Sequence, residues 1–196
     1  FTLSELVTLS GRMSARWAAG VRLLESLRPR CLHNAERLAD LDTAGALGLQ
    51  FCSGHQILRF YALREQLADA RSPARRRQLL VSLEQLVRAE RDTTAQLVPL
   101  AQRHSFLGFH SEAEGYKYFP ALLEWRLRQL DRLLETEFPA VAACLGRSGP
   151  LFPRYTGAAA AALTRPLRPP SPADVATLEA LPVGPVVACP THEGGV

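Results

Sequence analysis

The chain has 196 residues, of which 47% are hydrophobic and 21% charged, and its formal net charge is +4. This composition is typical of a folded globular protein and excludes a collagen-like chain, a heptad rod or a fully disordered chain. No apolar run approaches the roughly 18 residues of a membrane helix, and the basic charge lacks the aromatic interleaving of nucleic-acid binders, so we expect neither partner.

The first predicted element is a helix over residues 3–28. Thr2 and Glu5 have the spacing of a capping box, in which the threonine hydroxyl accepts from the Glu5 amide and the carboxylate reaches back. Pro29 ends the helix, because the residue before a proline avoids the helical region. Apolar residues recur every three or four positions and form one stripe that we expect to face the core: Leu6, Leu9, Met13, Trp17, Val21, Leu24 and Leu27.

The next helical segment, residues 32–69, has two interpretations. Its apolar pattern is interrupted by Gly45, Gly48 and Gly54, each of which costs on the order of 1 kcal/mol in a helix interior. Either one long helix uses its glycines for close backbone approach, or two helices are broken near Gly54. In both cases we expect His55 to be a packed or hydrogen-bonded histidine rather than a ligand.

Prolines predict the limits of two further helices. Ser72 caps the third helix, which Pro99 is expected to kink or end near residue 98. The last helix covers residues 120–138 and ends before Pro139. Trp125 in this helix is expected in the core, as is Trp17.

No segment has the alternation that predicts a β-strand. The sequence therefore predicts an all-α fold, a four- to five-helix bundle over residues 1–145. Nine of the 14 prolines fall in residues 146–196, which we expect to form a linker or disordered tail.

The two ends and the cysteines add two further expectations. The chain begins at Phe1 without an initiator methionine, which is typical of a fragment of a longer protein. The four cysteines are widely spaced and form no CxxC or zinc-ligand pattern. Such thiols are typical of a reducing compartment, so we expect a cytoplasmic location.

The densest group of chemically useful side chains lies in the connection 104–120. Aromatic rings combined with carboxylates and an imidazole are typical of sugar-facing loops. The candidate ligand-binding residues are His110, Glu112, Glu114, Tyr116 and Tyr118. The alternative is structural: the aromatic rings Phe106, Phe109 and Phe119 would close the end of the bundle.

No catalytic residue, metal site or cofactor is predicted. Glu112 and Glu114 are a poor glycosidase pair, because that chemistry needs two carboxyl groups flanking a bond, normally from different elements. The sequence contains no HExxH, GxxxxGK[ST], GxGxxG or GxSxG motif, and no Glu-x-x-His pair for a di-metal bundle site.

Residues 107–120 and 123–130, with the first helix and residues 60–64, resemble a helical region of large bacterial glycoside-hydrolase-like proteins. In those proteins the region follows a barrel-type catalytic domain. The resemblance implies a non-catalytic accessory domain that buttresses this barrel, with the catalytic domain of the same polypeptide as partner and carbohydrate as a further one. The alternative is a free-standing helical protein-interaction module. A buttress should expose a large apolar patch where the other domain docks.

Overall fold

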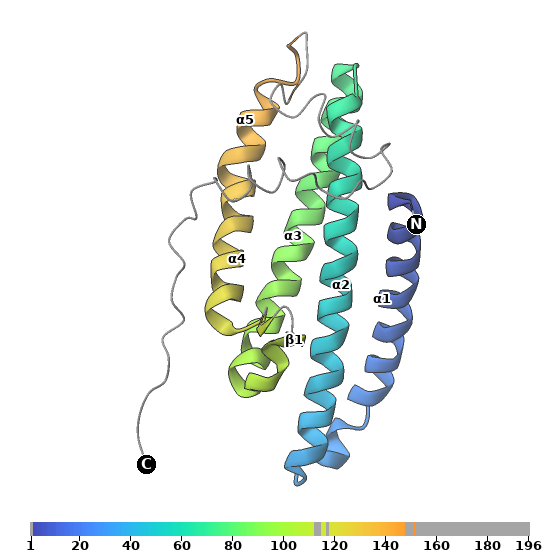
Figure 1. Ribbon diagram of the computed structural model, residues 1–196, viewed down its shortest axis with the longest axis vertical. Coiled ribbons are helices and arrows are strands. Elements are labelled where there is room, and N and C mark those ends of the chain that lie inside the picture. Colours follow the sequence, from blue (N-terminus) through green and yellow to red (C-terminus); the bar gives the residue numbers. More distant parts are fainter. Residues whose placement is uncertain (1, 112–114, 117, 148–150, 152–196) are drawn as a thin grey trace, which may run out of the picture. The chain divides into compact units, whose positions relative to one another are not determined.

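The fold is built from antiparallel helices joined by short connections. Figure 1 shows the computed structural model, which describes residues 2–111, 115, 116, 118–147 and 151. Connections this short place consecutive helices side by side. Each helix packs mainly against the next in chain order, α1 on α2, α2 on α3 and α3 on α4. The first three helices are α1 (Leu3–Glu25), α2 (Ala35–Asp69) and α3 (Pro73–Arg103), with a 3-10 turn η1 (Arg28–Cys31) after α1.

A mixed connection leads from α3 to the last helices. It contains a 3-10 turn η2 (Ser105–Gly108) and two short antiparallel strands, β1 (Phe109–Ser111) and β2 (Gly115–Tyr116). The expectation of no strand is wrong here, because pairs this short are too brief to show an alternating pattern. The helical chain then continues as α4 (Pro120–Arg132), a π-helical turn η3 (Leu133–Glu137) and α5 (Phe138–Ala142). The predicted all-α helical bundle is confirmed.

The predicted helix starts are confirmed at the level of single hydrogen bonds. Thr2 Oγ1 accepts from the Glu5 amide at 3.2 Å, and the Glu5 carboxylate accepts from the Thr2 amide at 2.7 Å. Ser72 caps α3 in the same way, by accepting from the Arg75 amide. Asn34, which the sequence analysis did not single out, caps α2. Each of these capping side chains lies three residues before the amide from which it accepts.

Residues 35–69 form one long helix, which decides between the two interpretations. Gly48 permits close approach of α1: a Cβ there would lie 3.1 Å from Cδ1 of Trp17. Gly11 of α1 likewise faces His55, whose Nδ1 lies 3.0 Å from Oγ of Ser10. Burial lowers the pKa of His55, and the charge of Arg59 acts in the same direction. The expectation that His55 is a packed, hydrogen-bonded histidine is confirmed.

Two glycines of α2 should respond oppositely to alanine. A Cβ at Gly54 meets open space, so Gly54→Ala should raise the free energy of unfolding by about 0.5–1 kcal/mol through reduced backbone entropy of the unfolded chain. Gly48→Ala should lower it by about 1 kcal/mol or more, because Trp17 must move away from the new methyl group. Urea titration of both variants measures the two signs; a stabilised Gly48→Ala would contradict the close packing of α1 on α2.

Two prolines do not end their helices as predicted. α3 continues through Pro99 to Arg103, and the helical chain passes Pro139 and ends at Ala142. Before Pro139 the helix widens, with the amide of Phe138 donating to the carbonyl of Leu133 five residues earlier. Such π-turns accommodate a residue that lacks an amide hydrogen. Both chain segments still contribute to the core beyond the proline, through Ala101 after Pro99 and through Val141 and Leu145 after Pro139.

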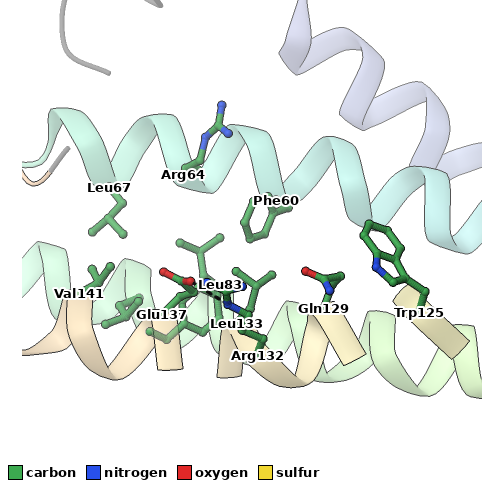
Figure 2. A pocket seen from close by; sticks show the side chains of 12 residues that line it. Phe60, Arg64, Leu67, Leu83, Trp125, Gln129, Arg132, Leu133, Glu137 and Val141 are labelled. Atoms are coloured by element: carbon green, nitrogen blue, oxygen red, sulfur yellow. Dashed lines mark ion pairs between the residues drawn. The ribbon is translucent and has the colours of Figure 1, made fainter. Parts of the chain in front are cut away.

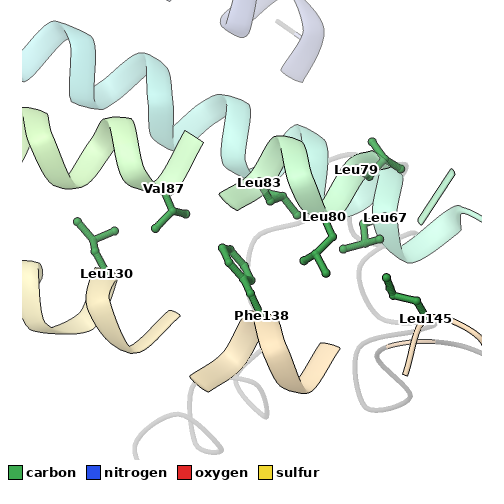
Figure 3. Packing of buried hydrophobic residues seen from close by; sticks show 8 residues of the cluster. All are labelled: Leu67, Leu79, Leu80, Leu83, Val87, Leu130, Phe138 and Leu145. Carbon is green, nitrogen blue, oxygen red and sulfur yellow. The ribbon is translucent and has the colours of Figure 1, made fainter. Parts of the chain in front are cut away.

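The core consists of two clusters between α2, α3 and the α4–α5 segment. Figure 3 shows the larger one, in which Leu130 and Phe138 face the buried side chains of α3. Its members are Leu67, Leu79, Leu80, Leu83, Val87, Leu130, Phe138 and Leu145. The second cluster joins Ala46, Leu97, Ala101, Leu107 and Leu123. Neither cluster contains a residue of α1.

Several residues predicted for the core lie at the surface. Trp125 is 51% exposed and Trp17 is 37% exposed, although Trp17 still packs on α2 through an edge-on contact with Phe51. Phe106 and Phe119 are exposed as well, so they do not close the bundle end. The described part of the chain supplies no neighbour that covers these side chains completely.

The helical unit extends a little beyond the predicted limit at residue 145. Leu145 is buried in the larger cluster and Leu151 packs against it. The buried Arg76 donates to the backbone carbonyls of Ala70 and Arg147, which fastens this segment to the start of α3. The predicted tail lies outside the described residues from residue 152 onward.

Candidate functional site

The predicted ligand-binding residues lie in the β1–β2 connection. His110 belongs to β1 and Tyr116 to β2, so the backbone brings them onto paired strands. Glu112 and Glu114 lie outside the described residues. Tyr118 is half-buried against the second core cluster, and its amide donates to the carbonyl of Gly108 at 3.3 Å. A carbohydrate site in this loop stays a prediction.

A buried polar cluster on the inner face of α3 is the first site that sequence reasoning missed. Glu90 is 5% exposed and receives three donors on one carboxylate oxygen, Oε1. Ser53 Oγ donates at 2.8 Å, Thr94 Oγ1 at 3.2 Å, and Nη2 of Arg126 lies at 2.6 Å. Three helices therefore meet at this carboxylate, since Ser53 lies on α2 and Arg126 on α4.

The second oxygen of this carboxylate has no such partner. Glu90 Oε2 and Gln56 Oε1 are both buried acceptors that receive no hydrogen bond from the described part of the chain. Burial raises the pKa of Glu90, and the charge of Arg126 with the hydrogen bonds from Ser53 and Thr94 offsets only part of this. An unsatisfied buried acceptor costs about 1–3 kcal/mol, so these two atoms mark a place where a donor would bind favourably.

Gln56 and Glu90 line a cavity of about 160 Å³ between α2, α3 and α4. A larger cavity of about 530 Å³ adjoins it, and the two share the walls Phe60 and Leu133. Figure 2 shows Phe60 and Leu67 of α2 across this larger space from Leu133 and Val141. The space exists because α2 and α4 both pack against α3 and hardly touch each other.

A second buried carboxylate, Asp42 of α2, contacts two arginines and a histidine at the other end of the helices. Arg28 Nη2 lies at 2.9 Å, Arg103 Nη2 at 3.1 Å and His104 Nε2 at 2.9 Å from its oxygens. Burial acts to raise the pKa of Asp42, but the hydrogen bonds from His104, Arg28 and Arg103 hold it below the usual value. This cluster connects the turn after α1 with the end of α3, which is a structural role.

The outer face of α1 is the third feature. The predicted stripe exists, but none of its residues is buried. Six apolar side chains at helical spacing are exposed by 37–47%, and we refer to them as the α1 face: Leu6, Leu9, Met13, Trp17, Leu24 and Leu27. Trp17 is nevertheless anchored, because its Nε1 donates to the Ala44 carbonyl at 2.9 Å. The expectation that this stripe faces the core is wrong.

Ser53 donates to Glu90 and lines neither of the two cavities. Among the described residues no three histidine, cysteine or acidic side chains are grouped as metal ligands. No helix in the described part of the chain is long and apolar enough to span a bilayer.

Comparison of the chain with protein-family models, with curated proteins and with solved structures finds no match.

Proposed function

We propose that this chain is a non-catalytic helical docking module that binds another protein domain through the α1 face. The observation that carries the proposal is the position of α1. Trp17 of its apolar stripe packs on α2, whereas Leu9 and Met13 are left exposed by the described residues. A contiguous apolar face of this kind is typical of a protein-interaction surface.

The charges beside the α1 face favour an acidic partner. Arg12 and Arg16 adjoin Leu9 and Met13 along the same hollow of the helix surface. Neither arginine forms an ion pair with a carboxylate of the described residues. Complementary charges at the edge of an apolar contact guide association and select the partner. The partner expected here is a protein surface with apolar side chains flanked by carboxylates.

The same charges disfavour a second copy of this chain as the partner. Arg12 and Arg16 flank the midpoint of α1 (Leu3–Glu25), so a parallel or an antiparallel copy would place arginines opposite arginines. Juxtaposed like charges oppose such pairing. The resemblance to glycoside-hydrolase-like proteins supplies one candidate partner, a catalytic domain of the same polypeptide. Two of the five residues behind the carbohydrate expectation, Glu112 and Glu114, lie outside the described residues, so docking is the better-supported function.

A pair of synthetic helices tests the proposal. Both peptides have about 20 residues and leucine at helical spacing, but one carries glutamate and the other lysine at the flanking positions. We expect the acidic peptide to bind the full chain at least tenfold more tightly than the basic one, as measured by isothermal titration calorimetry at low salt. The double variant L9Q/M13Q should weaken this binding at least tenfold, and R12Q/R16Q should remove the preference for the acidic peptide.

The matched control is Val81→Gln, which replaces an exposed aliphatic side chain on α3. It should leave peptide binding unchanged. All three variants should keep the wild-type free energy of unfolding within about 0.5 kcal/mol. Equal binding of the two peptides, or none, would contradict the proposal. Self-association of the wild type that L9Q/M13Q abolishes in sedimentation would show instead that a second copy covers the face.

A further inference from the structure

The two adjoining cavities between α2, α3 and α4 form a binding site that is independent of the α1 face. The larger cavity, about 530 Å³, lies in the size range of small-molecule sites. Its walls are mostly apolar, as Figure 2 shows for Phe60, Leu83 and Leu133. Polar groups are confined to its rim and to the inner end, where the smaller cavity begins. An apolar space with a few placed polar groups is typical of a ligand site.

The inner end contains two unsatisfied hydrogen-bond acceptors. Gln56 Oε1 and Glu90 Oε2 belong to side chains that are at least nine-tenths buried, and neither atom receives a hydrogen bond from the described residues. The hydroxyls of Ser53 and Thr94 and Nη2 of Arg126 all serve Glu90 Oε1 and leave Oε2 unsatisfied. A ligand that places an O–H or N–H here would satisfy acceptors that are otherwise costly to bury.

The charge balance of the site determines the charge of its ligand. Glu90 and Arg126 form a buried pair with no net charge, and the rim pair Arg132 and Glu137 is balanced as well. A cationic ligand would lie beside Arg126 and an anionic one beside Glu90, so either would bring an uncompensated charge into a buried site. A neutral donor carries no such penalty.

We propose that this cavity binds an uncharged molecule that has an apolar, ring-sized body and one hydrogen-bond donor, which it directs at Gln56 and Glu90. The apolar body occupies the space between Phe60 and Leu133. The donor reaches the inner end and replaces any water held there. The specificity comes from the donor, because a site with unpaired buried acceptors discriminates against an otherwise equal molecule that cannot satisfy them.

Two probes of nearly equal shape test this recognition: 2-naphthol, which has a hydroxyl donor, and 2-methoxynaphthalene, which has none. Calorimetric titration of the full chain should give a dissociation constant at least tenfold lower for 2-naphthol, corresponding to about 1.4 kcal/mol. Gln56→Leu removes one acceptor and should bring the two constants within about threefold of each other. This variant is expected to fold, since it replaces an unsatisfied buried amide by an apolar group.

Gln129→Leu is the matched control, because Gln129 lines the larger cavity but not the smaller one. It should leave the preference for 2-naphthol intact. Equal affinities of the two probes for the wild type would overturn the proposal, since the acceptors would then be satisfied by water alone. Absence of binding by either probe up to millimolar concentration would overturn it too. An unchanged preference for 2-naphthol in Gln56→Leu would show that Gln56 does not recognise the donor, which contradicts the proposal.

Discussion

The Arg126→Met variant should unfold with a free energy about 3 kcal/mol lower than the wild type at neutral pH. Arg126 is the only cation paired with Glu90 in the described part of the chain, and the carboxylate is buried among α2, α3 and α4. Removing one partner leaves an uncompensated charge in the interior, which costs more than the pair itself contributes. Urea titration followed by far-ultraviolet circular dichroism measures the loss.

The pH dependence separates this electrostatic cost from simple loss of packing. Without Arg126 the pKa of Glu90 should rise further above the usual value near 4.3. Below that value Glu90 is protonated in both the folded and the unfolded states, so the substitution costs least there. As the pH rises, the unfolded state ionises first and the difference between variant and wild type should widen.

The double variant E90Q/R126M is the control for the first prediction. It removes both charges and keeps an acceptor for Ser53 and Thr94, so it should recover most of the stability that Arg126→Met loses. Its difference from the wild type should also vary less with pH. A double variant as unstable as Arg126→Met would mean that the methylene groups of Arg126, rather than its charge, hold α4 in place.

The local signals in the sequence predicted the helices well because each signal acts within one turn. Thr2 with Glu5, and Ser72 with Arg75, close helix starts through bonds between residues three positions apart. The prolines were misjudged for the opposite reason. The cost of Pro99 is local, but Ala101 beyond it is buried by distant segments, and that packing cannot be read from the residues around the proline.

The apolar stripe of α1 shows a different limit. A helical period identifies which side of a helix avoids water, but it does not say whether the same chain supplies the neighbour. For Leu83 on α3 the neighbour is present, whereas Met13 on α1 is left exposed by the residues that the structure describes. The same ambiguity explains why Trp125, which has the spacing of a core residue, lies at the rim of the cavity instead.

The inward-facing positions of Glu90 and Arg126 could have been predicted from the helical period of the sequence. Glu90 follows Leu86 by four positions and Val87 by three, so it occupies the buried stripe of α3. Arg126 stands three positions after Leu123 and four before Leu130 in the same way. A charged residue at a stripe position predicts a buried, paired group. The partner and the unsatisfied oxygen follow only from the arrangement of three helices in space.

The second large effect is expected at the other end of the helices, where Asp42→Ala should lower the free energy of unfolding by about 3 kcal/mol. The substitution removes the shared acceptor of Arg28, Arg103 and His104. The loss lies at the low end for a buried pair, because the two arginines are partly exposed and regain water. Thermal and urea unfolding of the full chain at pH 7 measure it.

The pKa of Asp42 is shifted in the opposite direction to that of Glu90, but the loss in Asp42→Ala depends on pH in the same direction as the loss in Arg126→Met. The pKa of Asp42 is held below its usual value, so its contribution is complete above about pH 4 and is lost as the pH falls through the lower, folded-state value. The difference between Asp42→Ala and wild type should therefore narrow in acid. Asp40→Ala removes an exposed carboxylate two residues away that pairs with the exposed Arg37, and it should change stability by less than about 0.5 kcal/mol. Equal losses in the two variants would contradict this prediction. They would show that the bonds of Asp42 to Arg28, Arg103 and His104 add no stability beyond that of an exposed carboxylate on α2.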